Sequence, residues 1–323
     1  MSVTWKQIRH RIEWLALKTA AESIPLLSRD AFPLLSNALG RTAFLADKRS
    51  RNDAIENLRA ALPDREESEL RGLARDSMVA FARSQLDAFW TPRLNADNYL
   101  EFVDFEFESP DIETRARERG AIWVTPHYGS FDWISLVFGY RGFSFRVIAQ
   151  PFKNPLLDQI FIDHREHSGH QVIPQQGAML KLLRHLKSGG HGAFLIDLSL
   201  KPDQAATVVQ CHGLFTSVTK LHAELAIRTG LPLIPTVSVP RLGGGYTMRI
   251  FDPIDAASGD DPREIAQACW DRIEPQIVLD PAPWLWSYKH WRYLPDEELT
   301  DGRNYPGYAN RNKKFDKLVA KVL

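Results

Sequence analysis

A histidine and an aspartate stand five residues apart in the segment Val124-Thr-Pro-His127-Tyr-Gly-Ser-Phe-Asp132-Trp. We expect a buried strand to end at Thr125, Pro126 to stop it, and Asp132 to open the next helix. A carboxylate that bonds one ring nitrogen of a histidine fixes its tautomer and stabilises the imidazolium. The other nitrogen can then take a proton from a hydroxyl, so the pair predicts general-base acyl transfer, with His127 as the base and Asp132 as its orienting carboxylate.

The spacing alone does not decide the chemistry. Ten histidines and 40 acidic residues among 323 make one such pair common by chance. The alternative is that Asp132 only caps a helix and His127 is a polar residue at the end of a strand.

The elements around this pair alternate between strand-like and helix-like patterns. Strand-like runs are 101–107, Ala121–Thr125, Phe145–Ala149, Gln171–Ile173, Ala193–Ile196, Leu233–Val239 and Tyr246–Phe251; helix-like runs are 131–139, 154–168, 177–187, 217–229 and 262–278. This alternation predicts an α/β fold with a largely parallel central sheet flanked by helices. Ligands bind at the carboxyl ends of such strands, which is where His127 falls.

The first ninety residues differ from this core. Helical spacing of Trp5, Ile8, Ile12 and Leu15 predicts a helix over 4–27, and two more helices are expected over 50–90, with Asp64 as the N-cap of the second. The sequence has no internal repeat or long linker. We therefore expect one domain: a helical N-terminal layer (1–95), an α/β catalytic core (100–295) and a basic tail (303–323).

Composition excludes several classes of protein. The 44% hydrophobic and 25% charged residues are typical of a globular chain, and equal numbers of basic and acidic residues argue against a nucleic-acid partner. Two cysteines, Cys211 and Cys269, cannot build a disulfide framework and fit a reducing compartment. We expect no membrane-spanning helix, because no uncharged apolar run reaches the ~18 residues required. We also expect no signal peptide, because charges interrupt the N-terminal apolar stretch.

The match around His127 continues along the chain and resembles a known family. The segment 124–133 resembles the His-x-x-x-x-Asp/Glu box of glycerolipid and lysophospholipid acyltransferases. Further blocks follow in the order of the bacterial lipid A biosynthesis (late) acyltransferases, and the resemblance covers about residues 5–295: Asn154–Ile160 with Arg165, Leu186–Gly190 with Asp197, Cys211–Gly213, Ala223–Pro235 and Trp286–Arg292.

The resemblance implies a glycerolipid acyltransferase-like fold and a role for further residues. It implies that Arg165 holds a phosphate of the acceptor and that Asp197 also contacts substrate. It also implies a fatty acyl thioester of acyl carrier protein or coenzyme A as cosubstrate, with no metal or redox cofactor. The acceptor would be a hydroxyl of a membrane glycolipid precursor, and the enzyme would lie on the cytoplasmic face of the bacterial inner membrane as a peripheral or monotopic protein.

Two departures from the family pattern keep the acceptor open. Asp132 stands where the lipid A subfamily commonly has Glu, and Cys211-His212-Gly213 stands where it commonly has Phe-Phe-Gly. A lysophospholipid or a mannosylated phosphatidylinositol is therefore the alternative acceptor to a lipid A precursor.

Two more distant functions also remain open. His164, His167 and His170 could serve a metal-dependent hydrolase, although their spacing does not match helical zinc sites. A non-catalytic membrane-associated binding protein would not need His127.

Both ends of the chain are basic. Residues 1–50 carry eight Lys or Arg against four Asp or Glu, and residues 303–323 carry six against one. In the tail, helical spacing places Phe315, Leu318, Val319 and Val322 on one face. We expect this amphipathic tail, together with the N-terminal helix, to contact an anionic membrane surface. The alternative is that both ends fold back onto the domain.

Overall fold

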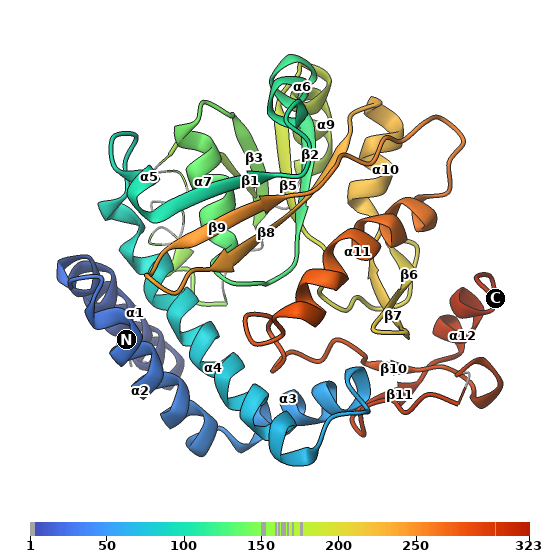
Figure 1. Cartoon of the computed structure of the whole chain (residues 1–323), viewed down its shortest axis with the longest axis horizontal. Coiled ribbons are helices and arrows are strands. Elements are labelled where there is room, and N and C mark those ends of the chain that lie inside the picture. Colours follow the sequence, from blue (N-terminus) through green and yellow to red (C-terminus); the bar gives the residue numbers. More distant parts are fainter. Residues whose placement is uncertain are drawn as a thin grey trace.

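The fold is a central sheet with helices on both faces and a helical layer at the N-terminal end (Figure 1). This computed structural model describes residues 4–149, 153–158, 160, 162, 166, 168–169, 171–174, 177–300 and 302–323. The strands are β1 (Val103–Phe107), β2 (Ala121–Thr125), β3 (Phe145–Ala149), β4 (Gln171–Pro174), β5 (His191–Leu195), β6 (Ala206–Cys211), β7 (Leu214–Thr219), β8 (Leu233–Pro240), β9 (Tyr246–Ile250), β10 (Tyr293–Leu294) and β11 (Asn310–Arg311).

Helices precede and connect these strands. They are α1 (Trp5–Ser23), α2 (Ala31–Ala46), α3 (Lys48–Ala61), α4 (Glu67–Trp90), α5 (Tyr99–Phe102), α6 (Ile112–Arg119), α7 (Phe131–Tyr140), α9 (Ala178–Lys187), α10 (Leu221–Thr229), α11 (Pro262–Leu279) and α12 (Lys313–Val319), with short 3₁₀ turns η1 (Ile24–Leu26), η2 (Thr91–Arg93) and η3 (Glu297–Leu299). The predicted helix over 154–168 lies partly outside the described residues.

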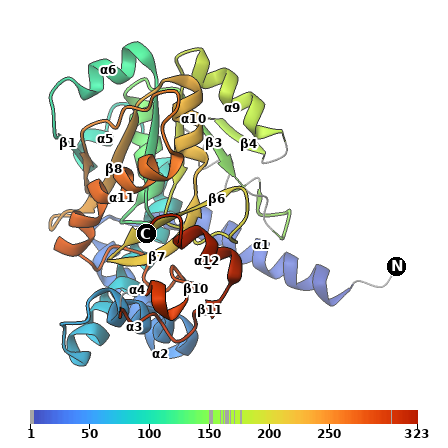
Figure 2. The same cartoon turned by 90° about the vertical axis from the view of Figure 1, so that its right-hand side faces the viewer.

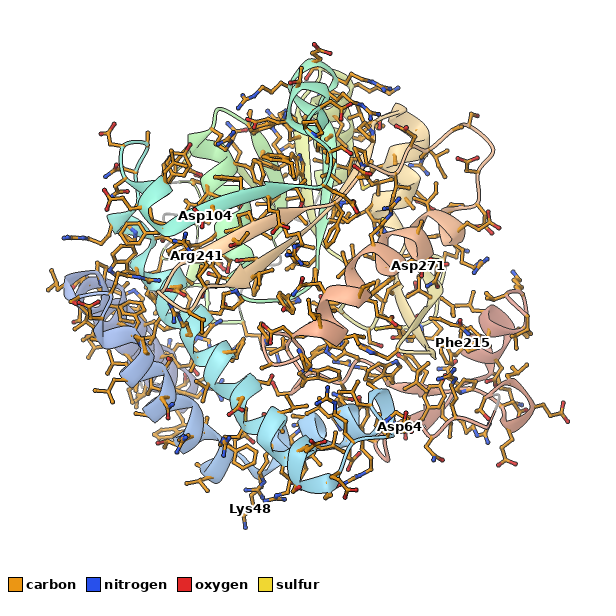
Figure 3. The ribbon with its side chains drawn as sticks, in the orientation of Figure 1. Lys48, Asp64, Asp104, Phe215, Arg241 and Asp271 are labelled. Atoms are coloured by element: carbon orange, nitrogen blue, oxygen red, sulfur yellow. The ribbon has the colours of Figure 1, made fainter. Side chains whose placement is uncertain are left out.

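The seven-stranded sheet has the order β1-β9-β8-β2-β5-β3-β4. All neighbouring pairs are parallel except β8 and β9, so the predicted largely parallel α/β fold is confirmed. Strand β2 lies in the middle, and all five of its residues are buried. The β8–β9 pair is a hairpin, and Arg241 in its turn forms an ion pair with Asp104 on β1, both labelled in Figure 3.

The structure differs from the sequence expectations at several boundaries. Strand β5 starts two residues earlier than predicted, and residues 217–219 belong to strand β7, not to the helix that follows it. The sequence analysis missed the β6–β7 hairpin, whose two-residue turn is His212-Gly213 with φ of 51° and 70°. Glu66, and not Asp64, is the N-cap residue of α4, and its side chain forms no capping hydrogen bond.

The C-terminal tail folds back onto the domain. Phe315 and Val319 are fully buried and pack with Val208 of β6 and Phe215 of β7. Figure 3 labels Phe215, and Figure 1 shows α12 beside this hairpin. The apolar face of the tail, which we expected to lie on a membrane, therefore packs against the rest of the protein. The expectation that this apolar face lies on a membrane surface is wrong for Phe315 and Val319, and for the tail the alternative, that it folds back onto the domain, is confirmed.

The N-terminal helix, unlike the C-terminal tail, does not bury its apolar residues in the domain. Helix α1 has no buried residue, and it extends away from the body of the protein (Figure 2). Asn154 ties it to the core by donating to the carbonyl of His10 at 2.8 Å and to the carboxylate of Glu13 at 3.0 Å. Among the described helices, none is long and apolar enough to cross a membrane.

Candidate active site

His127 lies immediately beyond the carboxyl end of the central strand. Pro126 ends β2, and the carbonyl of His127 accepts a hydrogen bond from the backbone N–H of Leu285 at 3.1 Å. Two residues on, Gly129 has a φ of +57°, and a methyl group there would stand 1.9 Å from the carbonyl oxygen of Ser238. The tight turn that carries His127 therefore requires glycine at this position.

A carboxylate from the neighbouring strand holds this histidine. Strands β2 and β5 pair in parallel with Thr125 opposite Leu195, so His127 and Asp197 each stand two residues beyond the same register row. Nδ1 of His127 lies 2.7 Å from Oδ1 of Asp197, and the backbone N–H of His127 donates to Oδ2 at 2.8 Å. Both the ring and the backbone of His127 are thus fixed by one aspartate.

This contact adds a second carboxylate to the site. The sequence analysis gave the orienting contact to Asp132, which stays a prediction, and the structure places Asp197 against His127 as well. The expected contact of Asp197 with substrate also stays a prediction; in the structure its side chain is fully buried and accepts bonds from His127 and Trp284. Parallel strands bring these residues, 70 positions apart, to the same edge of the sheet.

Asp132 lies in the first turn of α7, as predicted, and lines a cavity beside His127. Arg165 lies outside the described residues, as do His164, His167 and His170. In the part of the chain that the structure describes, no cluster of three or more His, Cys, Asp or Glu side chains could hold a metal ion.

The surroundings keep Asp197 ionised. Burial alone would raise its pKa, but the facing His127 and His290 rings and its hydrogen bonds lower that pKa to about 2. The indole Nε1–H of Trp284 donates a third bond to this carboxylate, at 3.0 Å from Oδ2. An ionised Asp197 accepts a hydrogen bond from the Nδ1–H group of His127, which keeps that proton on Nδ1 and leaves proton transfer to Nε2.

Sequence reasoning missed the groups behind Asp197. Trp284 and His290 come from the aromatic stretch 281–295, in which Trp284, Trp286 and Trp291 are fully buried. The density of aromatic residues there was the available signal, but it did not show that they pack around a carboxylate. Burial raises the pKa of the Cys211 thiol, which fits a packing role.

An apolar cavity of about 320 Å³ opens beside the histidine, between the sheet and α7. Its wall includes Trp123, Ala193 and Val147, which form one register row across β2, β5 and β3. Phe131 lines the cavity and also packs against the imidazole of His127, with ring centroids 4.6 Å apart. The cavity therefore has the size and lining of a site for an apolar chain, next to a partly exposed histidine that is held by a buried carboxylate.

The fold and the site together define a class of protein: an α/β enzyme with a histidine–carboxylate pair at the carboxyl edge of its sheet and an apolar cavity beside it. Residues 3–293 match the family model described as bacterial lipid A biosynthesis acyltransferase, and the chain belongs to that family. It is an acyltransferase of the lipid A and glycolipid type.

Curated relatives fall into two groups. The chain is 30% identical over 220 residues to a phosphatidylinositol mannoside acyltransferase of Mycobacterium tuberculosis, covering 67% of this chain and 69% of that protein. It is 28% identical to the protein of that name from Mycolicibacterium smegmatis, covering 68% and 72%. A lipid A biosynthesis acyltransferase of Haemophilus influenzae is 23% identical over 86% of both chains.

Proposed function

We propose that this enzyme transfers a fatty acyl chain from a thioester carrier to a hydroxyl of a membrane glycolipid precursor, with His127 as general base. The observation that carries the proposal is the 2.7 Å contact between His127 and the buried Asp197 beside an apolar cavity. Asp197 holds the proton on Nδ1, and Nε2 of His127 takes the proton of the acceptor hydroxyl.

The reaction then follows from the placement of these groups. The hydroxyl oxygen attacks the thioester carbonyl and forms a tetrahedral intermediate, and His127 returns the proton to the departing thiolate. Backbone N–H groups in the first turn of α7 supply donors for the oxyanion, because the first N–H groups of a helix lack partners within it. The acyl chain occupies the cavity between α7 and the sheet.

The two remaining predicted site residues keep roles in the proposal. Asp132, in the first turn of α7, is the second carboxylate proposed to orient His127, and it lies near the positive charge that develops on the imidazole. Arg165 holds a phosphate of the acceptor, since its guanidinium can form two parallel bonds with phosphate oxygens. Neither role requires a metal or a redox cofactor.

A lipid A precursor is the first candidate acceptor. The family model that covers residues 3–293 supports this choice. A mannosylated phosphatidylinositol is the second candidate, because the relatives with 28–30% identity carry that activity in their names. A lysophospholipid remains a further alternative. Both acyl carrier protein and coenzyme A thioesters are proposed as donors.

The enzyme reaches its lipid through the N-terminal helices. Trp5, Ile12 and Leu15 are between 60% and 75% exposed along α1, and Leu34 on α2 is 75% exposed. Basic residues outnumber acidic ones on α1 by four to two. An exposed apolar stripe flanked by Lys and Arg suits the headgroup region of an anionic bilayer. We propose peripheral attachment to the cytoplasmic face of the inner membrane through this surface.

A reconstituted assay tests the function. The purified chain is mixed with acyl carrier protein or coenzyme A thioesters and with vesicles that contain a lipid A precursor, a mannosylated phosphatidylinositol or a lysophospholipid. Mass spectrometry then identifies which lipid gains an acyl group. His127→Ala should lose about 100- to 10,000-fold in rate while remaining folded.

The same assay separates the distant alternatives. Loss of activity in chelator, or thioester hydrolysis without an acylated lipid, would favour the metal-dependent hydrolase. Full activity of a folded His127→Ala variant would show that His127 is not the general base. The absence of turnover with every donor and acceptor, despite vesicle binding, would favour a non-catalytic binding protein.

A further inference from the structure

His290 contacts Asp197 and is not among the residues that line the cavity. Its side chain belongs to the aromatic stretch 281–295, and the residue is 2% exposed. The imidazole stacks on the indole of Trp284, with ring centroids 4.1 Å apart and an interplanar angle of 25°. Trp284 in turn donates to the carboxylate of Asp197, so the three residues form one packed unit.

Both ring nitrogens of His290 face carbonyl oxygens. Nδ1 lies 3.1 Å from the backbone oxygen of Asp197, and Nε2 lies 2.8 Å from the backbone oxygen of Leu285. A neutral imidazole has one N–H, so it can satisfy one of these acceptors and must point a ring lone pair at the other. A buried carbonyl without its donor costs about 1–3 kcal/mol. The protonated ring, with two N–H groups, satisfies both.

Other buried histidines of this protein provide a contrast. Nδ1 of His191 faces a donor, the indole N–H of Trp123, at 3.4 Å. Neither ring nitrogen of His222 has a hydrogen-bond partner among the described residues. Burial lowers the pKa of each of these two rings to about 4, so both are neutral at pH 7. Two acceptors at hydrogen-bond distance distinguish His290 from both.

We propose that His290 is a buried imidazolium cation that has Asp197 as its nearby counter-ion and acts as a positioning residue for His127. The stacked face of Trp284 adds a cation–π contribution, and two carbonyls take the two N–H groups. The cation also balances the charge of Asp197, which has no exposed side-chain surface. A buried charge needs such a partner because its desolvation is costly.

Four titratable groups surround this ring. Asp197 and His127 come from the ends of β5 and β2, His212 from the β6–β7 turn, and Tyr288 from the same stretch, with its ring centroid 5.1 Å away. Burial is the largest effect on the pKa of His290 and leaves it below the ordinary value, although Asp197 and the two carbonyl acceptors raise it. The ground for a proton on each ring nitrogen is the pair of acceptors, which a neutral ring cannot both satisfy. Among these four groups, Asp197 is the one that carries a negative charge at neutral pH, so it is the counter-ion.

A cation beside Asp197 would lower the pKa of His127, the general base. This consequence rests on the proposed function. The carboxylate alone favours protonation of His127, and a protonated base cannot accept the proton of a hydroxyl. Positive charge at His290 offsets part of that attraction. His127 then stays unprotonated over a wider range of pH.

Nuclear magnetic resonance tests the charge without any assay of activity. In the full chain labelled with ¹⁵N-histidine, the ring of His290 is assigned through its proximity to the Trp284 indole protons. We expect both ring nitrogens to carry protons at pH 7, whereas His191 and His222 in the same spectrum should each show one protonated and one unprotonated nitrogen. One unprotonated nitrogen at His290 would overturn the proposal, whatever the enzyme transfers.

A variant tests the consequence for His127. His290→Gln removes the cation. The acidic limb of the pH profile of kcat/KM, which reports protonation of His127, should then move to higher pH by about one unit. His222→Gln is the matched control: it also replaces a buried histidine, and its acid limb should stay in place. A lower kcat with an unmoved acid limb would show that His290 only supports packing. If the wild-type enzyme showed no acyl transfer, the proposed function would be wrong. The NMR spectrum would then still decide whether His290 is charged.

Discussion

Replacing Asp197 by Asn separates the contact found in the structure from the one expected from sequence spacing. Three donors converge on this carboxylate: the backbone N–H of His127, its Nδ1–H and the indole N–H of Trp284. Asn offers one acceptor oxygen and one NH₂ group, so its NH₂ must face a donor. His127 then adopts the other tautomer or loses its orientation. We expect kcat to fall about 10⁴-fold, the size seen when the aspartate of a catalytic triad is replaced in this way.

The same carboxylate contributes to stability. Its pKa is about 2 in the folded protein, compared with an ordinary value of 3.8. The difference corresponds to about 2 kcal/mol of unfolding free energy at neutral pH. Because the folded pKa is the lower one, this contribution is complete above pH 3.8 and disappears as the pH falls toward 2. Asp197→Asn should therefore unfold at lower denaturant concentration than wild type at pH 7.

The assay measures kcat and KM with a soluble acyl thioester, and circular dichroism checks folding. Asp132→Asn tests the second carboxylate and should lose less in kcat than Asp197→Asn. Asp64→Asn is the control, since Asp64 lies exposed near the start of α4 (Figure 3). If folded Asp197→Asn kept kcat within about tenfold of wild type, orientation of His127 by Asp197 would contribute little and the reasoning would fail.

Three further outcomes follow from the cavity and the two ends of the chain. Ala193→Leu narrows the cavity and should shift donor preference to shorter acyl chains in a competition assay read by mass spectrometry, since each methylene without room costs about 1–3 kcal/mol. Ile12→Glu should weaken sedimentation with anionic vesicles and leave the thermal midpoint unchanged, because the side chain is exposed. Phe315→Ala should cost about 3–5 kcal/mol in a denaturant titration and leave vesicle binding intact. Unchanged donor preference, unchanged vesicle binding and unchanged stability, respectively, would contradict these three expectations.

Hydrophobic patterning was sufficient to predict most of the core. The strand at 121–125 is apolar up to Thr125 and lies fully buried in the middle of the sheet, where both faces are covered. The hairpin of β6 and β7 was harder to predict, because its turn, His212-Gly213, places a histidine at positive φ. Turns of that geometry favour Asn, Asp or Gly, so the residue types there did not signal a hairpin.

Patterning could not predict what covers an apolar face. The stripe of Trp5, Ile12 and Leu15 on α1 and the stripe of Phe315 and Val319 on α12 both repeat with helical spacing and both lie among basic residues. In the structure the first is exposed and the second is fully buried. The difference comes from the β6–β7 hairpin, which supplies Val208 and Phe215 as partners for α12. A helical period identifies a face, but a tertiary contact decides whether the protein or a membrane meets it.

The site shows the same limit at the level of single contacts. Sequence spacing favours partners that are close along the chain, and Asp132 was the nearest carboxylate to His127. A parallel sheet brings together residues that follow neighbouring strands, and Thr125 opposite Leu195 places Asp197 beside His127. The stretch 281–295 packs against that pair, where Trp284 bonds the carboxylate of Asp197 and His290 lies at its backbone oxygen. The sequence placed Asp197 at the strand end on this edge of the sheet, but because β2 and β5 are neighbours only through the strand order, its contact with His127 depends on topology and could not be read from the motif that identified the histidine.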